Sequence, residues 1–233
     1  MNAGGHIAVA SRALASREAA ETGAGAGTET AEVTDRPGYL LGSALPDLGS
    51  IGGYRLLGAS PDPSVTAGID LHHRTDDAFH RHPWFADRNR SLADRLQADG
   101  VGRGAARACS HVGIELLLDG ELLADPLLVA ATDDAYGGIP DRLDALDGLV
   151  DEQHRSGWRE HLRRVAAWRM PDDYDQPDAV ARRLHRILAR RPRLALADDR
   201  VGTVAEALAA VQPGIRATAP EFLAELTELV RSH

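Results

Sequence analysis

Apolar residues recur every three or four positions through most of this chain, whereas apolar and polar residues never alternate over more than about four positions. The first spacing is typical of amphipathic helices and the second of half-buried strands. The pattern therefore predicts an all-α protein. Since it shows neither an internal repeat nor a composition break, we expect a single-domain helical bundle covering 1–233.

Glycine, proline and capping residues delimit the expected helices. The predicted ranges are 5–20, 38–58, 65–80, 83–98, 102–118, 121–132, 139–149, 152–169, 177–190, 202–211 and 218–231. Between the first two, the small, polar and glycine-rich stretch 22–37 is expected to form a flexible loop. Pro46 is expected to break or kink the second helix, and Ser64 to cap the third. Residues 195–233 are expected to hold the C-terminal helices.

The composition excludes several chemistries. All 26 basic residues are arginine, so a P-loop lysine and a Schiff-base lysine are impossible. Cys109 is the only cysteine, which excludes an intramolecular disulfide, a Cys-rich zinc site and an iron–sulfur centre. The net charge of −9 argues against nucleic acid as a partner, because such binding needs a basic surface.

The apolar segments also bear on location. The first residues lack a basic segment before an apolar run, so no signal peptide is predicted. No stretch approaches ~20 uninterrupted apolar residues, so no membrane span is predicted. We expect a cytoplasmic protein.

The segment GIDLHHRTDDAFHRHP carries the strongest chemical signal, because it holds two His/Asp pairs at helical spacing i,i+4. Each pair would place an imidazole and a carboxylate one turn apart, where they can share a metal ion. His72 and Asp76 are in phase with the apolar residues of this helix, whereas His73 and Asp77 fall on the neighbouring polar stripe. A buried aspartate is costly unless paired or metal-bound, so we favour His72 and Asp76 as ligands. The alternative is a buried hydrogen-bonded pair that joins two helices.

Three further segments add candidate ligands. His111 interrupts the apolar segment ACSHVGIELLLDG, and Glu115 follows one turn later. His6 begins the apolar run HIAVA, and Asp47 follows Pro46 in another apolar segment. Each has an ordinary structural alternative: a core histidine, an exposed terminal histidine and a helix cap. Together they form a nitrogen and oxygen donor set that suits Mn²⁺, Fe²⁺, Zn²⁺ or Mg²⁺, and a helical bundle can bring such residues to one site.

In this order the segments resemble the acyl carrier protein phosphodiesterase family, a helical HD-domain-like group of metal-dependent phosphohydrolases. The resemblance rests on MNAGGH, GSALPD, GIDLHHRTD, His82–Pro83, Ser110–His111 and RRPRL at 190–194. The family has an Asp-His dyad where this chain has Ser110 and His111, and Glu115 is one turn away as a substitute carboxylate. The stretch 22–37 has the character of an insertion.

The resemblance implies that one or two divalent ions are held by His6, Asp47, His72, Asp76 and His111. It also implies hydrolysis of the phosphodiester between phosphopantetheine and a serine of acyl carrier protein. A histidine that titrates near neutral pH suits protonation of the leaving alkoxide, and phosphate binding suits arginine. The candidates for these two roles are His73, His80 and His82, and Arg74, Arg190, Arg191 and Arg193.

Two other functions stay open. The H-x-x-x-(E/D) pairs are also similar to those of zinc-dependent phospholipase C-like helical proteins, so the substrate could be a phospholipid or a nucleotide, a small phosphodiester in either case. Alternatively, the chain is a noncatalytic helical protein whose His/Asp pairs are structural. Bound metal distinguishes the enzyme readings from the noncatalytic one.

Overall fold

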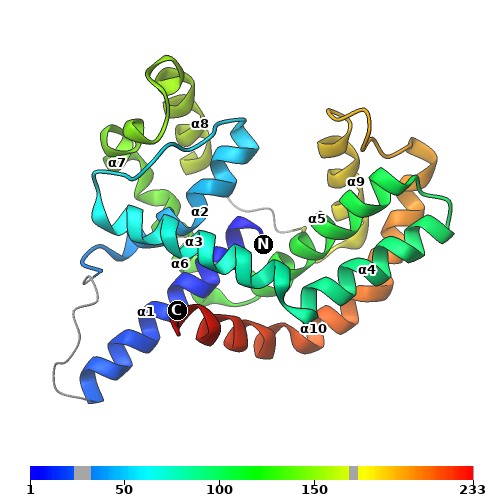
Figure 1. Cartoon of the computed structure of the whole chain (residues 1–233), viewed down its shortest axis with the longest axis horizontal. Coiled ribbons are helices and arrows are strands. Elements are labelled where there is room, and N and C mark those ends of the chain that lie inside the picture. The colour runs from blue at the N-terminus through cyan, green and yellow to red at the C-terminus, as the bar shows by residue number, and fades with distance from the viewer. Residues whose placement is uncertain (24–32, 168–172, 233) are drawn as a thin grey trace. The chain divides into compact units, whose positions relative to one another are not determined.

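A computed structural model describes residues 1–23, 33–167 and 173–232 of the chain (Figure 1). Within these ranges the regular elements are all helices, and no strand occurs among them. The all-α prediction is therefore confirmed for the described part of the chain. None of the described helices is both long and apolar enough to cross a membrane.

Ten α-helices and three short 3₁₀ segments make up the described structure. The α-helices are α1 (Ala3–Gly23), α2 (Arg36–Gly52), α3 (Pro63–Arg81), α4 (Pro83–Ala98), α5 (Arg103–Leu122), α6 (Pro126–Gly137), α7 (Ile139–Leu146), α8 (Arg155–Ala167), α9 (Pro177–Leu188) and α10 (Val201–Arg231). The 3₁₀ segments are η1 (Asp147–Leu149), η2 (Glu152–His154) and η3 (Asp198–Arg200).

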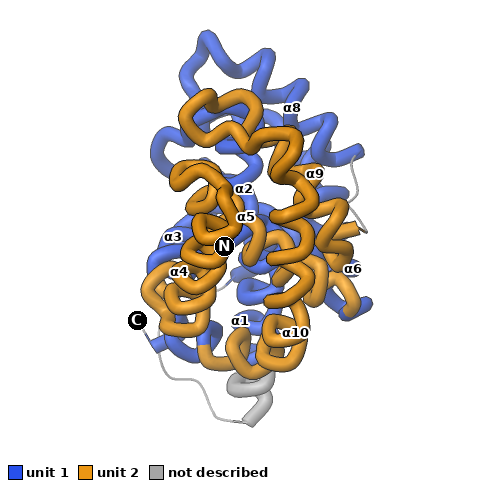
Figure 2. The backbone as a smooth tube through the Cα atoms, turned by 90° about the vertical axis from the view of Figure 1, so that its right-hand side faces the viewer, with its two compact units in different colours: residues 1–77, 125–170, 226–233 blue, residues 78–124, 171–225 orange. Residues whose placement is uncertain are grey.

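The chain divides into two compact units, coloured separately in Figure 2. Unit 1 comprises residues 1–77, 125–170 and 226–233, and unit 2 comprises 78–124 and 171–225. The boundary falls within α3 and within α10. The expectation of a single domain stays a prediction, and each unit is described by itself below.

In unit 1, helices α1, α2 and α6 pack against one another, and α8 packs against α2, α6 and α7. The core consists mainly of aliphatic side chains, with the fully buried ring of Trp158 among them. Its indole nitrogen donates a hydrogen bond to the carbonyl oxygen of Leu146 at 2.9 Å. Arg142 of α7 forms ion pairs with Asp35 and Asp62, which precede α2 and α3.

Two glycines of unit 1 let the backbones of α2 and α3 approach closely. A Cβ atom on Gly42 would lie 2.2 Å from the carbonyl oxygen of Val65, and one on Gly68 would lie 2.2 Å from that of Tyr39. Neither carbonyl is a flexible side-chain end, so any larger residue would force the helices apart. This approach sets the position of α3, which carries His72 and Asp76.

In unit 2, α5 packs against both α4 and α9. Phe79, Phe85 and Phe222 form an aromatic cluster, with ring centroids 4.4 Å apart for the first two and 5.8 Å for Phe79 and Phe222. Trp84 stacks on Phe222 at 4.1 Å. This cluster lies beside the C-terminal end of α3, where His80 is located.

The prediction of a break at Pro46 is wrong, because α2 continues through this residue and ends at Gly52. An interior proline costs a helix about 3 kcal/mol. Four leucines of α2, namely Leu40, Leu41, Leu45 and Leu48, are almost completely buried, and each contributes about 1.5–3 kcal/mol. Packing therefore outweighs the proline, and Gly53 with a φ of 78° ends the helix instead.

Other boundaries also differ from the predictions. The loop expected over 22–37 is shorter at both ends, because α1 includes residues 22–23 and α2 begins at Arg36; residues 24–32 lie outside the described residues. Asp62, rather than Ser64, caps α3: its carboxylate accepts hydrogen bonds from the backbone N–H groups of Ser64 and Val65. One helix, α10, replaces the two expected over 202–211 and 218–231 and continues through Pro213 and Pro220.

Candidate metal centre

Three side chains of unit 1 could hold a metal ion together. His6 comes from α1, and His72 and Asp76 come from one face of α3. Each offers a ligand atom that lies within 4.8 Å of the other two. The two imidazole rings stack with their centroids 3.8 Å apart, and both histidines are buried. We call this set the His6 cluster.

The backbone of α2 fixes the orientation of His72. Its Nδ1 lies 2.8 Å from the carbonyl oxygen of Ser43. Because a carbonyl oxygen only accepts hydrogen bonds, Nδ1 carries the proton and the lone pair is on Nε2. Histidines that bind a metal through one ring nitrogen characteristically donate a hydrogen bond from the N–H of the other.

His6 faces the carboxylates through its Nε2 atom. This atom lies 3.1 Å from the carbonyl oxygen of Met1, 3.8 Å from Asp76 Oδ1 and 3.9 Å from Asp47 Oδ2. The other ring nitrogen, Nδ1, is buried and forms no hydrogen bond with any described residue. Asp47, whose Oδ2 lies 3.9 Å from His6 Nε2, is a further candidate carboxylate ligand beside the cluster.

Both histidines of the cluster are held neutral. Burial lowers the pKa of His6 well below its ordinary value, and the nearby His72 lowers it further. Burial also lowers the pKa of His72 to about 4, although the bond to Ser43 opposes this shift. A metal ligand must have a free lone pair, so neutral imidazoles are the form that a metal requires.

Asp76 has a cation beside it in the structure. The amino group of Met1 donates a hydrogen bond to its Oδ1 at 3.0 Å. A metal ion bound to Asp76 would have to displace this ammonium group from the carboxylate. The donor set, two imidazoles with one or two carboxylates, fits a divalent first-row ion.

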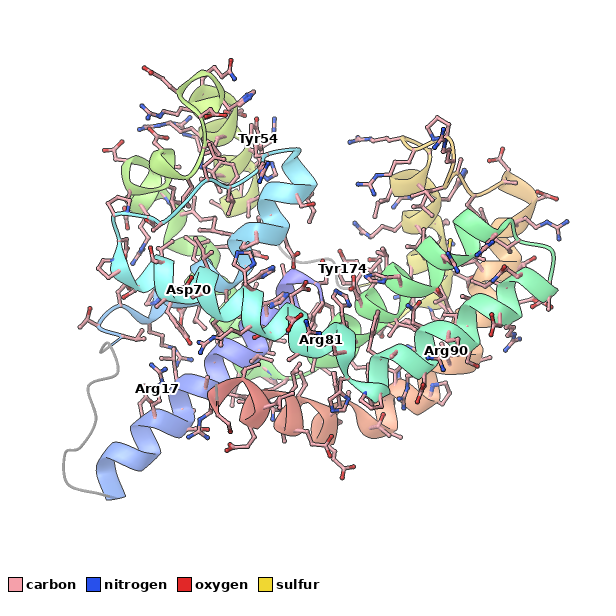
Figure 3. All side chains as sticks on the ribbon, viewed as in Figure 1. Arg17, Tyr54, Asp70, Arg81, Arg90 and Tyr174 are labelled. Carbon is pink, nitrogen blue, oxygen red and sulfur yellow. The ribbon has the colours of Figure 1, made fainter. Side chains whose placement is uncertain are left out.

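The neighbouring polar stripe of α3 faces solvent. His73 and Asp77 are exposed, as is Asp70, which is labelled in Figure 3. The burial of His72 agrees with the predicted helical phase, whereas Asp76, which was expected to be buried, has 39% of its side chain exposed. The exposed Arg74 lies about 160° around the helix from Asp76, so helix geometry places it away from the His6 cluster.

His111 and Glu115 belong to unit 2, where they lie with His80. Glu115 Oε1 is 3.2 Å from His111 Nε2 and 3.9 Å from His80 Nε2. Burial raises the pKa of Glu115, but the hydrogen bond with His111 is among the interactions that lower it, and the net shift is downward. The carboxyl group is therefore ionised at neutral pH.

The remaining predicted site residues are also in unit 2. His82 caps α4, because its Nδ1 accepts a hydrogen bond from the backbone N–H of Trp84 at 3.1 Å. Its Nε2 lies 3.5 Å from Glu225. Arg190, Arg191 and Arg193 are exposed in the turn after α9 and form no ion pair with a described residue.

Ser110, which stands where the resembled family has aspartate, is buried and faces α4. Two acceptors lie within reach of its single hydroxyl proton: Asn89 Oδ1 at 2.7 Å and the carbonyl oxygen of Arg107 at 3.0 Å. This side chain therefore links α5 to α4 and offers no donor to His80 or Glu115.

Sequence reasoning treated His80 as a candidate proton donor and did not group it with His111 and Glu115. Helical spacing gives a signal only within one helix, whereas His80 is on α3 and the other two residues are on α5. The Ser43 carbonyl and the Met1 amino group had no such signal, since they are backbone groups.

Comparisons with protein-family models, with curated proteins and with solved structures found no match for this chain.

Proposed function

We propose that this chain is a metal-dependent phosphodiesterase whose divalent ion is held by His6, His72 and Asp76. The observation that carries the proposal is the hydrogen bond of His72 Nδ1 to the Ser43 carbonyl, which leaves Nε2 as a ligand beside two other donors. Asp47 adds a carboxylate at 3.9 Å from His6 Nε2. His6 Nε2 lies 3.1 Å from the Met1 carbonyl oxygen and so carries the proton of this ring. For Nε2 to bind an ion, that proton would have to move to Nδ1, which forms no hydrogen bond with a described residue.

When bound, a divalent ion supplies a Lewis acid for the phosphoryl group and a water of lowered pKa. The protein residues would supply the rest. Asp76 and Asp47 provide negative charge that retains the cation, and the bond of His72 Nδ1 to the Ser43 carbonyl fixes the lone pair of His72 on Nε2. His73 is exposed, and its ring lies edge-on to that of His72 with centroids 5.4 Å apart, so its imidazole is the unit 1 candidate for protonating the leaving alkoxide.

The resemblance to acyl carrier protein phosphodiesterases suggests an HD-domain-like architecture and the phosphopantetheine–serine phosphodiester as substrate. An acyl carrier protein is acidic, and this chain carries a net charge of −9. The exposed Arg190, Arg191 and Arg193 are a local basic group that could contact such a partner. A phospholipid or a nucleotide is the alternative substrate class for the same chemistry.

One observation favours a noncatalytic role as the second candidate. The Met1 amino group is paired with Asp76, and His72 with the Ser43 carbonyl. Asp76 and His72 thus have polar partners within the chain, so they could serve a structural role without an ion.

The experiment compares Asp76→Asn with Asp77→Asn, its exposed neighbour on α3. Turnover of bis-p-nitrophenyl phosphate is measured with added Mn²⁺, together with metal content and thermal melting. Asparagine keeps the shape of aspartate and loses its charge. Changes beside a metal ligand already cost about 10–100-fold in affinity or activity, so Asp76→Asn should lose more than that, whereas Asp77→Asn should match the wild type.

Equal turnover of the two variants would exclude Asp76 as a ligand. A wild-type protein that neither binds a divalent ion nor turns over the ester would support the noncatalytic role. Turnover of the generic ester without release of phosphopantetheine from holo acyl carrier protein would favour the alternative substrates.

A further inference from the structure

We propose that unit 2 contains a second divalent metal site, made by His80, His111 and Glu115 and suited to Zn²⁺. It uses none of the ligands of the His6 cluster. The inference therefore goes beyond the proposed phosphodiesterase and does not depend on it.

Three donors from two helices converge at this site. His80 is near the end of α3, and His111 and Glu115 are one turn apart on α5. The ligand atoms of all three residues lie within 4.8 Å of one another. Glu115 Oε1 is the common neighbour, 3.2 Å from His111 Nε2 and 3.9 Å from His80 Nε2. Small side-chain rotations would bring these atoms to one ion.

Aromatic packing holds the two imidazoles in place. Their rings lie 4.8 Å apart with an interplanar angle of 32°. The ring of Phe85 contacts both, at 5.0 Å from His80 and 5.1 Å from His111, and Phe79 contacts His80 at 5.1 Å. The donors are therefore partly preorganised, which reduces the entropy lost on binding an ion.

The donor types select the ion. Two imidazoles and one carboxylate form the donor set of many zinc enzymes, and imidazole disfavours Mg²⁺ and Ca²⁺. Glu115 is buried, with 11% of its side chain exposed, whereas His80 and His111 are 31% and 41% exposed. Solvent can therefore reach the ion, and three protein ligands leave a coordination position for water.

Another pair in unit 2 provides a matched control. His185 Nε2 lies 3.1 Å from Asp198 Oδ1, a contact as short as that between His111 and Glu115. Among the described residues, two groups of three side chains could hold a metal ion, and His185 and Asp198 belong to neither. The His185→Gln variant should consequently leave metal binding unchanged.

The test is titration of the full-length, metal-stripped protein with Zn²⁺ and with Co²⁺, followed by calorimetry and by Co²⁺ visible absorption. The variants are His111→Gln, Glu115→Gln, His72→Gln and His185→Gln. Circular dichroism checks the fold of each variant. If Glu115→Gln does not fold, His111→Gln still tests the site, because His111 is partly exposed and its substitution leaves the core intact.

We expect two equivalents for the wild type and His185→Gln, and one equivalent for each of His72→Gln and His111→Gln. The affinity of the second site should fall more than about 100-fold in His111→Gln, beyond the loss caused by changes next to a ligand. If the His6 cluster binds no ion, the wild type should hold one equivalent that His72→Gln keeps and His111→Gln loses. Unchanged Zn²⁺ and Co²⁺ binding in a folded His111→Gln or Glu115→Gln protein would overturn the proposal.

Discussion

His72 and His73 are adjacent in the sequence but have different surroundings. A step of about 100° around α3 puts His72 against the Ser43 carbonyl, with 5% of its surface exposed, and puts His73 in solvent. The same step separates Asp76 from Asp77. Metal binding by the inner pair should therefore respond to changes at His72 and Asp76 and ignore changes at His73 and Asp77.

The helical phase of these residues was predictable from the apolar spacing of their neighbours. Their partners were not. The Ser43 carbonyl and the Met1 amino group are backbone groups, present at every residue, so no side-chain pattern marks them. Grouping His111 with the unit 1 residues relied on donor types, on helical packing and on the resemblance, and it stays a prediction. Within unit 2, the ring of His111 lies 4.8 Å from that of His80, a contact between α3 and α5 that no local spacing predicts.

The thiol of Cys109 is expected to be inert in the folded protein. Cys109 is fully buried, and burial raises its pKa to about 12. Since the thiolate is the reactive form, a thiol reagent should label the native chain only as fast as the structure opens. In denaturant it should label one thiol per chain rapidly. Mass spectrometry measures the extent of labelling. Rapid stoichiometric labelling without denaturant would contradict the packing of α5.

At the scale of the element, the approach of α2 to α3 depends on Gly42 and Gly68. The substitution Gly68→Ala puts a methyl group against the backbone carbonyl of Tyr39. Overpacking of this kind costs about 1–3 kcal/mol, and it should also weaken metal binding by moving His72 away from Ser43. The midpoint of denaturant unfolding and the metal affinity measure these two effects.

Gly137→Ala provides the control, because Gly137 is also helical in unit 1 and a Cβ there meets nothing within 4 Å. This variant should be neutral or more stable by up to about 1 kcal/mol. An equal loss of stability in both variants would show that the approach of α2 to α3 is not responsible.

The sequence predicted most helices but not where several of them begin and end; the helix expected over 121–132, for example, is α6 at Pro126–Gly137. The helix 83–98 was predicted with its observed bounds, since Pro83 and Gly100 mark both ends. At Pro46 the local signal predicted a break or a kink, and before Pro213 it predicted an end, yet the helix continues through both residues. Burial of side chains such as Ile215, Phe222 and Leu223 depends on tertiary packing, which local sequence does not report.

At the scale of the whole molecule, the net charge of −9 favours retention of cations and opposes approach of acidic partners. Binding of an ion to the folded state alone stabilises the protein. At a free Mn²⁺ concentration about 100 times the dissociation constant, the gain is about 2.7 kcal/mol. A chain of this size should then melt roughly 5–10 °C higher.

Differential scanning calorimetry with Mn²⁺ and with EDTA measures this shift. The double variant His72→Gln/His111→Gln, which lacks a ligand in each cluster, should melt at one temperature in both buffers. An equal rise in the wild type and the double variant would assign the stabilisation to Mn²⁺ bound elsewhere on the acidic surface.

The central claim is that His6, His72 and Asp76 hold one divalent ion. The most direct measurement is the anomalous difference map of a crystal grown with Mn²⁺. The account predicts a peak at coordination distance from His72 Nε2 and from an Asp76 oxygen, with the Met1 amino group displaced from Asp76. A map without a peak at His72 Nε2, in which the Met1 amino group remains bound to Asp76, would contradict it.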